Sequence, residues 1–310
     1  MNRGARTAAV VLALLTCTTS APAFAEQATP INDVTGPIGD MTGDGKSDIT
    51  ARTGDGRLVV YPQVNGSFGA PVTISYGWNG MAWIATGRID ANGGSDVLAT
   101  DGRGDLWLYA NGGFDGINTL RSREQSGTWD RWNFSWGRPT ITAYKVDGFD
   151  DVEILYPSRY PDTHENPIHQ RFNTGLPGLG RFEDFGHETL KEPGSIIWTK
   201  FSEHPGSVIG GKYRDRLLAY EDGRLVVRVF DIATVTYRQI VLGYGWNTLD
   251  SLMIKDVNGD GIEDILGRRI NDGALVVYEH RGWFDEQHPV DTYRPARVLG
   301  WGWHTVNQIS

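Results

Sequence analysis

Cysteine is almost absent from this chain, whose 310 residues include only Cys17. That residue lies in an N-terminal segment where Arg3 and Arg6 precede an apolar run at 8–15 and the small-residue motif Ala23-Phe-Ala25. This order is typical of a secretory signal peptide, so we expect cleavage after Ala25 and secretion of the remaining chain. The exported part then has no disulfide bond, and packing, with or without bound ions, must stabilise it.

Long hydrophobic runs are also missing. The run at 8–15 is too short to span a membrane, and no later segment is apolar enough to do so. The sequence around Cys17 is faintly similar to a lipoprotein box. Thr16, however, stands where a smaller residue is required. We therefore expect no lipid anchor at Cys17 and no membrane span.

Positive charge is scarce in the exported part, which has 27 basic and 38 acidic residues and a formal net charge of −11. This balance argues against partners such as nucleic acid or an anionic membrane. The sequence has no G-x-S-x-G motif, phosphate-binding loop or cysteine nucleophile. We expect a non-catalytic protein with no catalytic residues. The plentiful acidic residues leave open a glycosidase with separated carboxylates.

Glycine, by contrast, is abundant, with 40 residues, and two short patterns repeat along the chain. Leu-Val-Val-Tyr or a variant follows a Gly/Asp turn at 58–61, 106–109, 225–228 and 275–278. Gly-Trp elements, with a weaker copy at 186–187, recur every 51 to 59 residues. After a lead at 26–35, residues 36–310 thus divide into five repeats: 36–85, 86–143, 144–199, 200–254 and 255–310.

Each repeat contains four short apolar runs separated by glycine-rich turns, which predicts an all-β fold, a five-bladed β-propeller of four-stranded blades. The last repeat stops in mid-unit, and the residues it lacks match those at 38–40. Pairing of the N- and C-terminal segments would therefore close the ring and remove exposed sheet edges. A solenoid is the alternative. The third repeat is the most diverged, so a four- or six-bladed ring also stays open.

The pattern GD-x-[TN]-GDG-x-x-D, followed by DG-x-L-x-V-Y and G-x-G-W-N, resembles the FG-GAP/VCBS repeats. These build integrin-α-like propellers and propeller modules of secreted bacterial proteins. The resemblance covers most of 36–310 and is strongest in the first and last repeats. It implies a propeller with calcium loops. It implies little about function, because propellers include both enzymes and binding modules.

Two loops place oxygen-bearing side chains at positions 1, 3, 5 and 9 with glycine at position 6, as in the front of an EF-hand loop. We predict two structural Ca²⁺ sites. One consists of Asp40, Thr42, Asp44, the Lys46 carbonyl and Asp48; the other consists of Asp256, Asn258, Asp260, the Ile262 carbonyl and Asp264. Neither loop has a glutamate at position 12, so we expect weak binding. The alternative is an Asp/Gly turn satisfied by its own backbone.

The Gly-Trp elements have two interpretations. A tryptophan beside a polar residue offers a flat apolar face and a hydrogen-bonding group for a sugar. The same tryptophan in every repeat is equally explained as a packing residue. Trp129 and Trp132 lie in an insertion outside the repeat pattern. The predicted ligand-binding residues are Trp78, Asn79, Trp129, Trp132, Trp246, Asn247, Trp303 and His304.

These features favour a secreted, non-catalytic, lectin-like module that recognises extracellular or cell-surface glycans. The alternative is a protein-interaction propeller that docks on a secreted partner, such as a protease or a toxin-complex subunit. Its contacts would come from insertions in the second and third repeats, because long loops on a rigid scaffold often carry binding. A glycoside-active enzyme is the third hypothesis.

Overall fold

The computed structural model describes residues 39–90, 94–128, 140–145, 150–155, 165–174, 178, 182–191, 196–201, 208–210, 215–231 and 236–310. The predicted signal peptide and lead segment, Trp129 and Trp132 lie outside these residues. The chain divides into two units, Met1–Asp33 and Val34–Ser310, and every described residue belongs to the second.

The described strands form five four-stranded antiparallel sheets. From the inner to the outer strand, sheet 1 contains β22 (Val306–Ile309), β1 (Ile49–Thr53), β2 (Leu58–Tyr61) and β5 (Val72–Ser75). Sheet 2 contains β6 (Met81–Gly87), β7 (Asp96–Asp101), β8 (Asp105–Asn111) and β9 (Leu120–Thr128). Sheet 3 contains β10 (Thr140–Lys145), β11 (Asp150–Leu155), β12 (Glu165–Asn173) and β13 (Phe182–Lys191).

Sheet 4 contains β14 (Ile196–Phe201), β15 (Arg216–Tyr220), β16 (Leu225–Asp231) and β17 (Thr236–Gly243). Sheet 5 contains β18 (Leu249–Lys255), β19 (Asp264–Arg269), β20 (Leu275–Tyr278) and β21 (Arg297–Gly300). A small hairpin, β3 (Gln63–Val64) with β4 (Ser67–Phe68), lies between β2 and β5.

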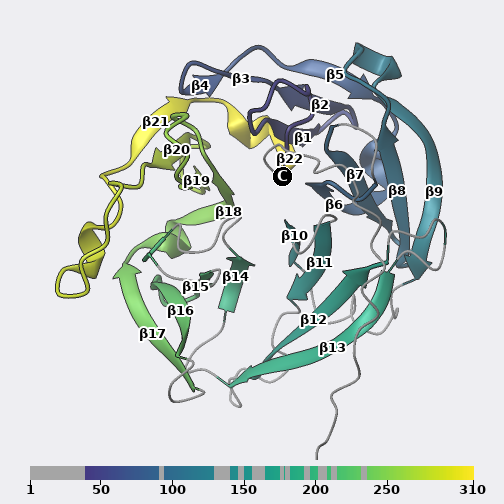
Figure 1. Cartoon of the computed structure of the whole chain (residues 1–310). Helices are drawn as coiled ribbons and strands as arrows, with labels where there is room; N and C mark the ends of the chain where they lie inside the picture. The colour runs from purple at the N-terminus through teal and green to yellow at the C-terminus, as the bar shows by residue number, and fades with distance from the viewer. Residues whose placement is uncertain are drawn as a thin grey trace, which may run out of the picture. The chain divides into compact units, whose positions relative to one another are not determined.

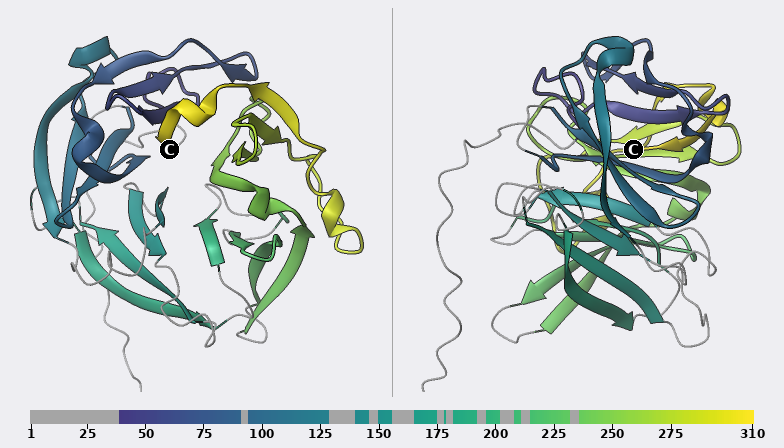
Figure 2. Two further views of the ribbon diagram at one scale, coloured as in Figure 1. Left: turned by 180° about the vertical axis from the view of Figure 1, so that it is seen from behind. Right: turned by 90° about the vertical axis from the view of Figure 1, so that its right-hand side faces the viewer.

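The sheets of this unit are arranged around a common centre, with their first strands innermost and β5, β9, β13, β17 and β21 outermost (Figure 1). The view from behind shows the same arrangement of the sheets around a centre (Figure 2, left). The predicted all-β propeller is therefore confirmed. Even the diverged third repeat supplies a regular four-stranded sheet.

The two ends of the described chain meet in sheet 1. Strand β22 pairs with β1 in the antiparallel register Ala51↔Ile309, and the backbones of Thr50 and Ser310 exchange two hydrogen bonds of 2.9 and 2.8 Å. The interrupted repeat is completed in this way, as the sequence predicts. One detail of the predicted units is different. The run that follows each Gly-Trp element pairs with the next repeat, so it is the inner strand of the following sheet.

The apolar core lies between neighbouring sheets, which explains why Leu-Val-Val-Tyr has no polar position. In β20, Leu275 and Val277 pack toward residues of sheet 1, such as Ile49 and Val59. Val276, between them in sequence, packs toward residues of sheet 4. Successive side chains of a strand point to opposite faces, so a strand covered on both sides is continuously apolar.

The antiparallel order defines two faces of the propeller. The hairpin face carries the turns between second and third strands (53–57, 101–105, 220–224 and 269–274) and the connections from sheet to sheet (76–80, 244–248 and 301–305). The loop face carries the loops at 40–48, 88–95 and 256–263 and the connections to outer strands at 62–71, 112–119 and 279–296. No helix among the described residues has the length and apolarity needed to cross a membrane.

Candidate functional site

The two predicted calcium loops fold around the carboxylate of their first aspartate. Asp256 Oδ1 accepts hydrogen bonds from Gly259 N (2.7 Å) and Asp260 N (3.2 Å), and its Oδ2 accepts one from Gly261 N at 2.9 Å. Asp40 accepts the three corresponding bonds in the first loop at the same distances. Each loop is thus a tight turn built on backbone N–H groups around one aspartate.

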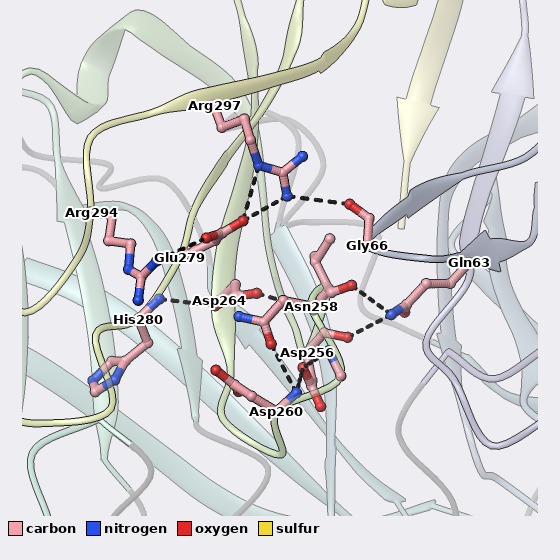
Figure 3. A network of polar contacts seen from close by, with 12 residues as sticks. Gln63, Gly66, Asp256, Asn258, Asp260, Asp264, Glu279, His280, Arg294 and Arg297 are labelled. Carbon is pink, nitrogen blue, oxygen red and sulfur yellow. Dashed lines mark hydrogen bonds and ion pairs between the residues drawn. The ribbon is translucent and has the colours of Figure 1, made fainter.

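The last aspartate of each loop connects the loop to the third strand. Asp264 Oδ2 accepts from Val257 N at 3.1 Å, and its Oδ1 accepts from His280 N at 2.9 Å (Figure 3). Asp48 joins Met41 N and Gln63 N in the same manner, each at 2.9 Å. Such bonds satisfy buried N–H groups at a loop that has no ladder partner.

Burial raises the pKa of Asp264 to about 7, against the opposing effect of the N–H groups of His280 and Val257. The nearby carboxylates of Asp260 and Asp256 raise this pKa as well. Burial likewise raises the pKa of Asp48, although hydrogen bonds from Gln63 and Thr42 and, less strongly, the Lys255 ammonium oppose this effect. Carboxylates concentrated in this way favour the approach of a cation.

The described residues do not, however, assemble a metal site. No group of three or more His, Cys, Asp or Glu side chains among them is arranged to hold a metal ion. Asp48 and Asp264 direct both carboxylate oxygens at backbone N–H groups, and so do Asp40 and Asp256. In this conformation the loops do not fit the predicted coordination, and the calcium assignment remains a prediction.

The same connecting aspartate is present in sheets whose loops have lost the metal pattern. Asp96 accepts from Ile89 N, Asp90 N and Asn111 N at 3.0, 2.9 and 2.8 Å. Asp215 accepts from the backbone N–H groups of residues 208 and 209. The sequence analysis did not single out Asp215. An aspartate directly before the second strand of each repeat was the signal that could have revealed it.

A second set of buried polar side chains joins four of the five pairs of neighbouring sheets among the described residues. Gln63 Nε2, in the hairpin β3–β4 that follows the third strand of sheet 1, donates to the carbonyls of Asp256 and Val257 in the loop between β18 and β19 of sheet 5, both at 2.9 Å (Figure 3). Asn111 Nδ2 reaches Met41 O at 3.0 Å, and Asn173 Nδ2 reaches Ile89 O at 2.9 Å. The equivalent contact from sheet 5 to sheet 4 joins His280 Nε2 to the carbonyl oxygen of residue 208. The predicted metal loops therefore also hold neighbouring sheets together.

The three tryptophans of the Gly-Trp elements that the structure describes are buried. Trp78, Trp246 and Trp303 are only 2, 5 and 8% exposed. Each ring packs on a tyrosine in the third strand of the sheet that follows it, with ring centroids 4.5–4.6 Å apart. The pairs are Trp78 with Tyr109, Trp246 with Tyr278 and Trp303 with Tyr61. The prediction that these three tryptophans stack on a sugar is wrong, because their faces are already covered.

The polar residues that follow these tryptophans are exposed, but they lie against the turn of the preceding sheet. Asn247 Nδ2 donates to Glu221 O at 3.0 Å, while Asn79 and His304 pack on the glycines of turns 53–57 and 269–274. Beside all three, the tryptophan backbone N–H donates to the turn glycine at 3.0 Å. The Asp-Gly turn and the Gly-Trp-Asn element are thus two halves of one contact.

A different aromatic set faces solvent on the hairpin face. Tyr76, Tyr244 and Trp301 are 66, 72 and 65% exposed. Each lies two residues before a buried tryptophan, and the glycine between them has φ near +85°. This left-handed conformation, which glycine adopts without strain, reverses the chain so that one aromatic ring points inward and the other outward. The sequence signal that could have revealed this set is the aromatic residue two positions before each buried tryptophan, in Tyr-Gly-Trp or Trp-Gly-Trp.

A cavity of about 460 Å³ lies on the same face where sheets 5 and 1 meet. Its walls are Arg52, Asp250, Arg268, Arg269, Ile270, Gly273, His304, Val306 and Asn307. Arg269 connects it to the exposed aromatic set, because its Cζ lies 5.4 Å from the centroid of the Trp301 ring. The walls of the cavity are mostly polar, and the Trp301 ring lies beside them, next to Arg269, so a ligand held by these polar groups has an aromatic surface next to it.

The guanidinium groups of this cavity are held in fixed positions. Arg268 forms a bidentate pair with Asp250, both N–O distances being 2.8 Å, and its Nη1 donates to the carbonyls of Trp303 and Val306. Arg52, the equivalent residue in sheet 1, donates from Nη1 to the carbonyls of Trp78 and Met81. Each of these two arginines thereby joins its sheet to the next one.

No protein-family model matches the chain, and no curated protein matches it. Among solved structures, the periplasmic gluconolactonase of Pseudomonas aeruginosa is similar, with 14% sequence identity and a TM-score of 0.38. The match covers 84% of this chain and 72% of that protein. A likeness at this distance carries no information about activity, and the resemblance to FG-GAP/VCBS repeats remains a prediction.

Proposed function

We propose that this protein is a secreted, non-catalytic, lectin-like module whose five sheets are the five blades of a propeller, and that it binds glycans through Tyr76, Tyr244 and Trp301. The observation that carries the proposal is the exposure of these rings at one equivalent position in three sheets. Tyrosine and tryptophan are enriched at binding surfaces because they combine a large apolar area with a polar group. Flat rings stack on the apolar faces of sugars, and repeated copies add avidity.

Glycan recognition is thus assigned to the exposed aromatic residues that precede the buried tryptophans, and not to the tryptophans themselves. A glycan array probed with the wild-type protein and with Trp301→Ala tests this assignment. We expect the variant to bind at least about tenfold more weakly, which corresponds to the loss of about 1.4 kcal/mol of stacking. Trp283→Ala is the matched control, since Trp283 is 48% exposed but lies in the connection at 279–296, on the loop face.

An array without hits for the wild-type protein, at millimolar calcium, would refute glycan recognition. Equal losses in Trp301→Ala and Trp283→Ala would refute the position of the site. Release of sugar from a bound glycan would show that the protein is an enzyme and would contradict the non-catalytic part of the proposal.

A protein partner is the second candidate function. The observation in its favour is the pair of exposed apolar side chains, Trp283 and Val290, on the long connection between β20 and β21. A pull-down from culture supernatant tests it. Capture of one secreted partner by the wild-type protein and by Trp301→Ala, but not by Trp283→Ala, would favour this function over the first.

A further inference from the structure

The cavity between sheets 5 and 1 is locally basic, although the exported chain is strongly acidic. Three guanidinium groups, those of Arg52, Arg268 and Arg269, line it together with a single carboxylate, that of Asp250. The position equivalent to Asp250 in sheet 1 is Asn307, which is neutral and also lines the cavity. Asp272, which pairs with Arg269 beside the cavity, brings the carboxylates to two, so the three guanidinium groups leave an excess of one positive charge, and Asn307 is neutral where sheet 5 has Asp250.

Arg269 retains hydrogen-bonding capacity toward a ligand. Its Nε and Nη2 donate to Asp272 at 3.1 and 2.6 Å, and these bonds leave the two N–H groups of Nη1 without a partner among the described residues. The side chain is 33% exposed, and its Cζ lies over the Trp301 ring. A planar guanidinium with free N–H groups binds carboxylate or sulfate oxygens with good geometry.

We infer that this cavity binds the anionic group of an acidic glycan, a carboxylate or a sulfate ester, while a neighbouring sugar ring stacks on Trp301. The inference rests on the proposed function and specifies its ligand class. Cavity size agrees with it, because about 460 Å³ lies within the range of about 300–1,000 Å³ that small-ligand pockets have. His304 and Asn307 supply further polar groups for the hydroxyls of the same ring.

The test uses an array of matched glycans on common cores, in which uronate, sulfated and neutral members differ only in the anionic group. We expect the wild-type protein to bind at least one acidic series about tenfold more tightly than its neutral core, the factor typical of one charge-assisted hydrogen bond. The uronate and sulfated arms identify which anion is bound. Equal binding of acidic and neutral members would overturn the inference.

Variants separate charge recognition from stacking. Arg269→Gln should lose the preference for acidic members while retaining the affinity for neutral cores. Arg294→Gln, which removes one exposed arginine from the connection on the loop face, should leave the preference unchanged. Asp250→Asn should strengthen acidic binding several-fold, because it removes the only carboxylate among the cavity walls. A preference that survives in Arg269→Gln, or falls equally in Arg294→Gln, would overturn the inference.

The failures of the two proposals are distinguishable. Binding of neutral glycans that depends on Trp301 but shows no preference for acidic members refutes only the ligand class. Absence of binding to every glycan refutes the proposed function and the ligand class together. Thermal unfolding of each variant verifies that a lost signal is not a lost fold.

Discussion

The contact of Asn111 with the first loop offers a direct test of how neighbouring sheets are held together. Asn111 is 2% exposed, and its Nδ2 donates to Met41 O at 3.0 Å and to Ser95 O at 3.1 Å. Its Oδ1 accepts from Gly113 N at 2.9 Å. Substitution by alanine removes all three bonds and leaves buried carbonyl groups without this donor.

Each of these hydrogen bonds contributes about 1 kcal/mol net, so Asn111→Ala should lower the free energy of unfolding by about 3 kcal/mol. Asn111→Asp should cost at least as much, because it places a carboxylate oxygen where Nδ2 faces two carbonyl groups. Urea denaturation, followed by tryptophan fluorescence, measures the difference from the midpoint at constant m-value.

The matched control is Asn118→Ala, in the connection that follows Asn111. Asn118 is exposed, and its side chain donates only to Asp115 Oδ2 at 3.2 Å. We expect a change within about 0.5 kcal/mol for this variant. A loss below about 1 kcal/mol for Asn111→Ala, or an equal loss for both variants, would refute the idea that these buried amides hold the sheets together.

Three further predictions concern packing, pH and calcium. Trp246→Ala should lower stability by about 3–5 kcal/mol, whereas Tyr244→Ala, two residues earlier, should change it by less than about 0.5 kcal/mol; reversed values in denaturant titrations would contradict the inward and outward assignments. Burial raises the pKa of Asp96 to about 7, so its contribution should be greatest below the unfolded pKa of 3.8 and decline as pH rises through about 7, by about 4 kcal/mol at most. Asp96→Asn should flatten the fall in stability between about pH 4 and 7, and an unchanged profile would argue against this source. Calcium should raise the melting temperature and a chelator should lower it, and both shifts should be larger in the wild-type protein than in a variant that lacks the Asp256 carboxylate. The absence of any shift would rule out the two predicted sites.

The repeat pattern in the sequence predicts the fold because the pattern reports burial. Strands such as β20 are apolar at every position, since the radial arrangement of sheets covers both of their faces. Pairing of the terminal segments was expected from the match between the last repeat and residues 38–40, and the register of β22 with β1 bears this out. The third repeat was least clear because the apolar alternation of β12 and β13 is interrupted by polar residues.

The candidate site depended on tertiary structure. Both Tyr244 and Trp246 are aromatic residues beside glycine, and composition does not tell which ring is buried; the left-handed Gly245 between them decides it. The basic cavity is equally invisible in sequence, because Arg52 and Asn307 are far apart along the chain and meet only where β22 pairs with β1.

The sequence by itself thus determined the local features, namely the turns, the strands and the number of repeats, because the pattern of each repeat is contained in its own residues. Only the tertiary structure decided which side chains are left for a ligand. In isolation, the aspartates of the two predicted calcium loops look like metal ligands. In the structure, Asp264 accepts hydrogen bonds from backbone N–H groups and thereby joins its loop to the end of the third strand. The cavity between sheets 5 and 1 is lined by side chains from two repeats, so its charge cannot be read from either repeat alone.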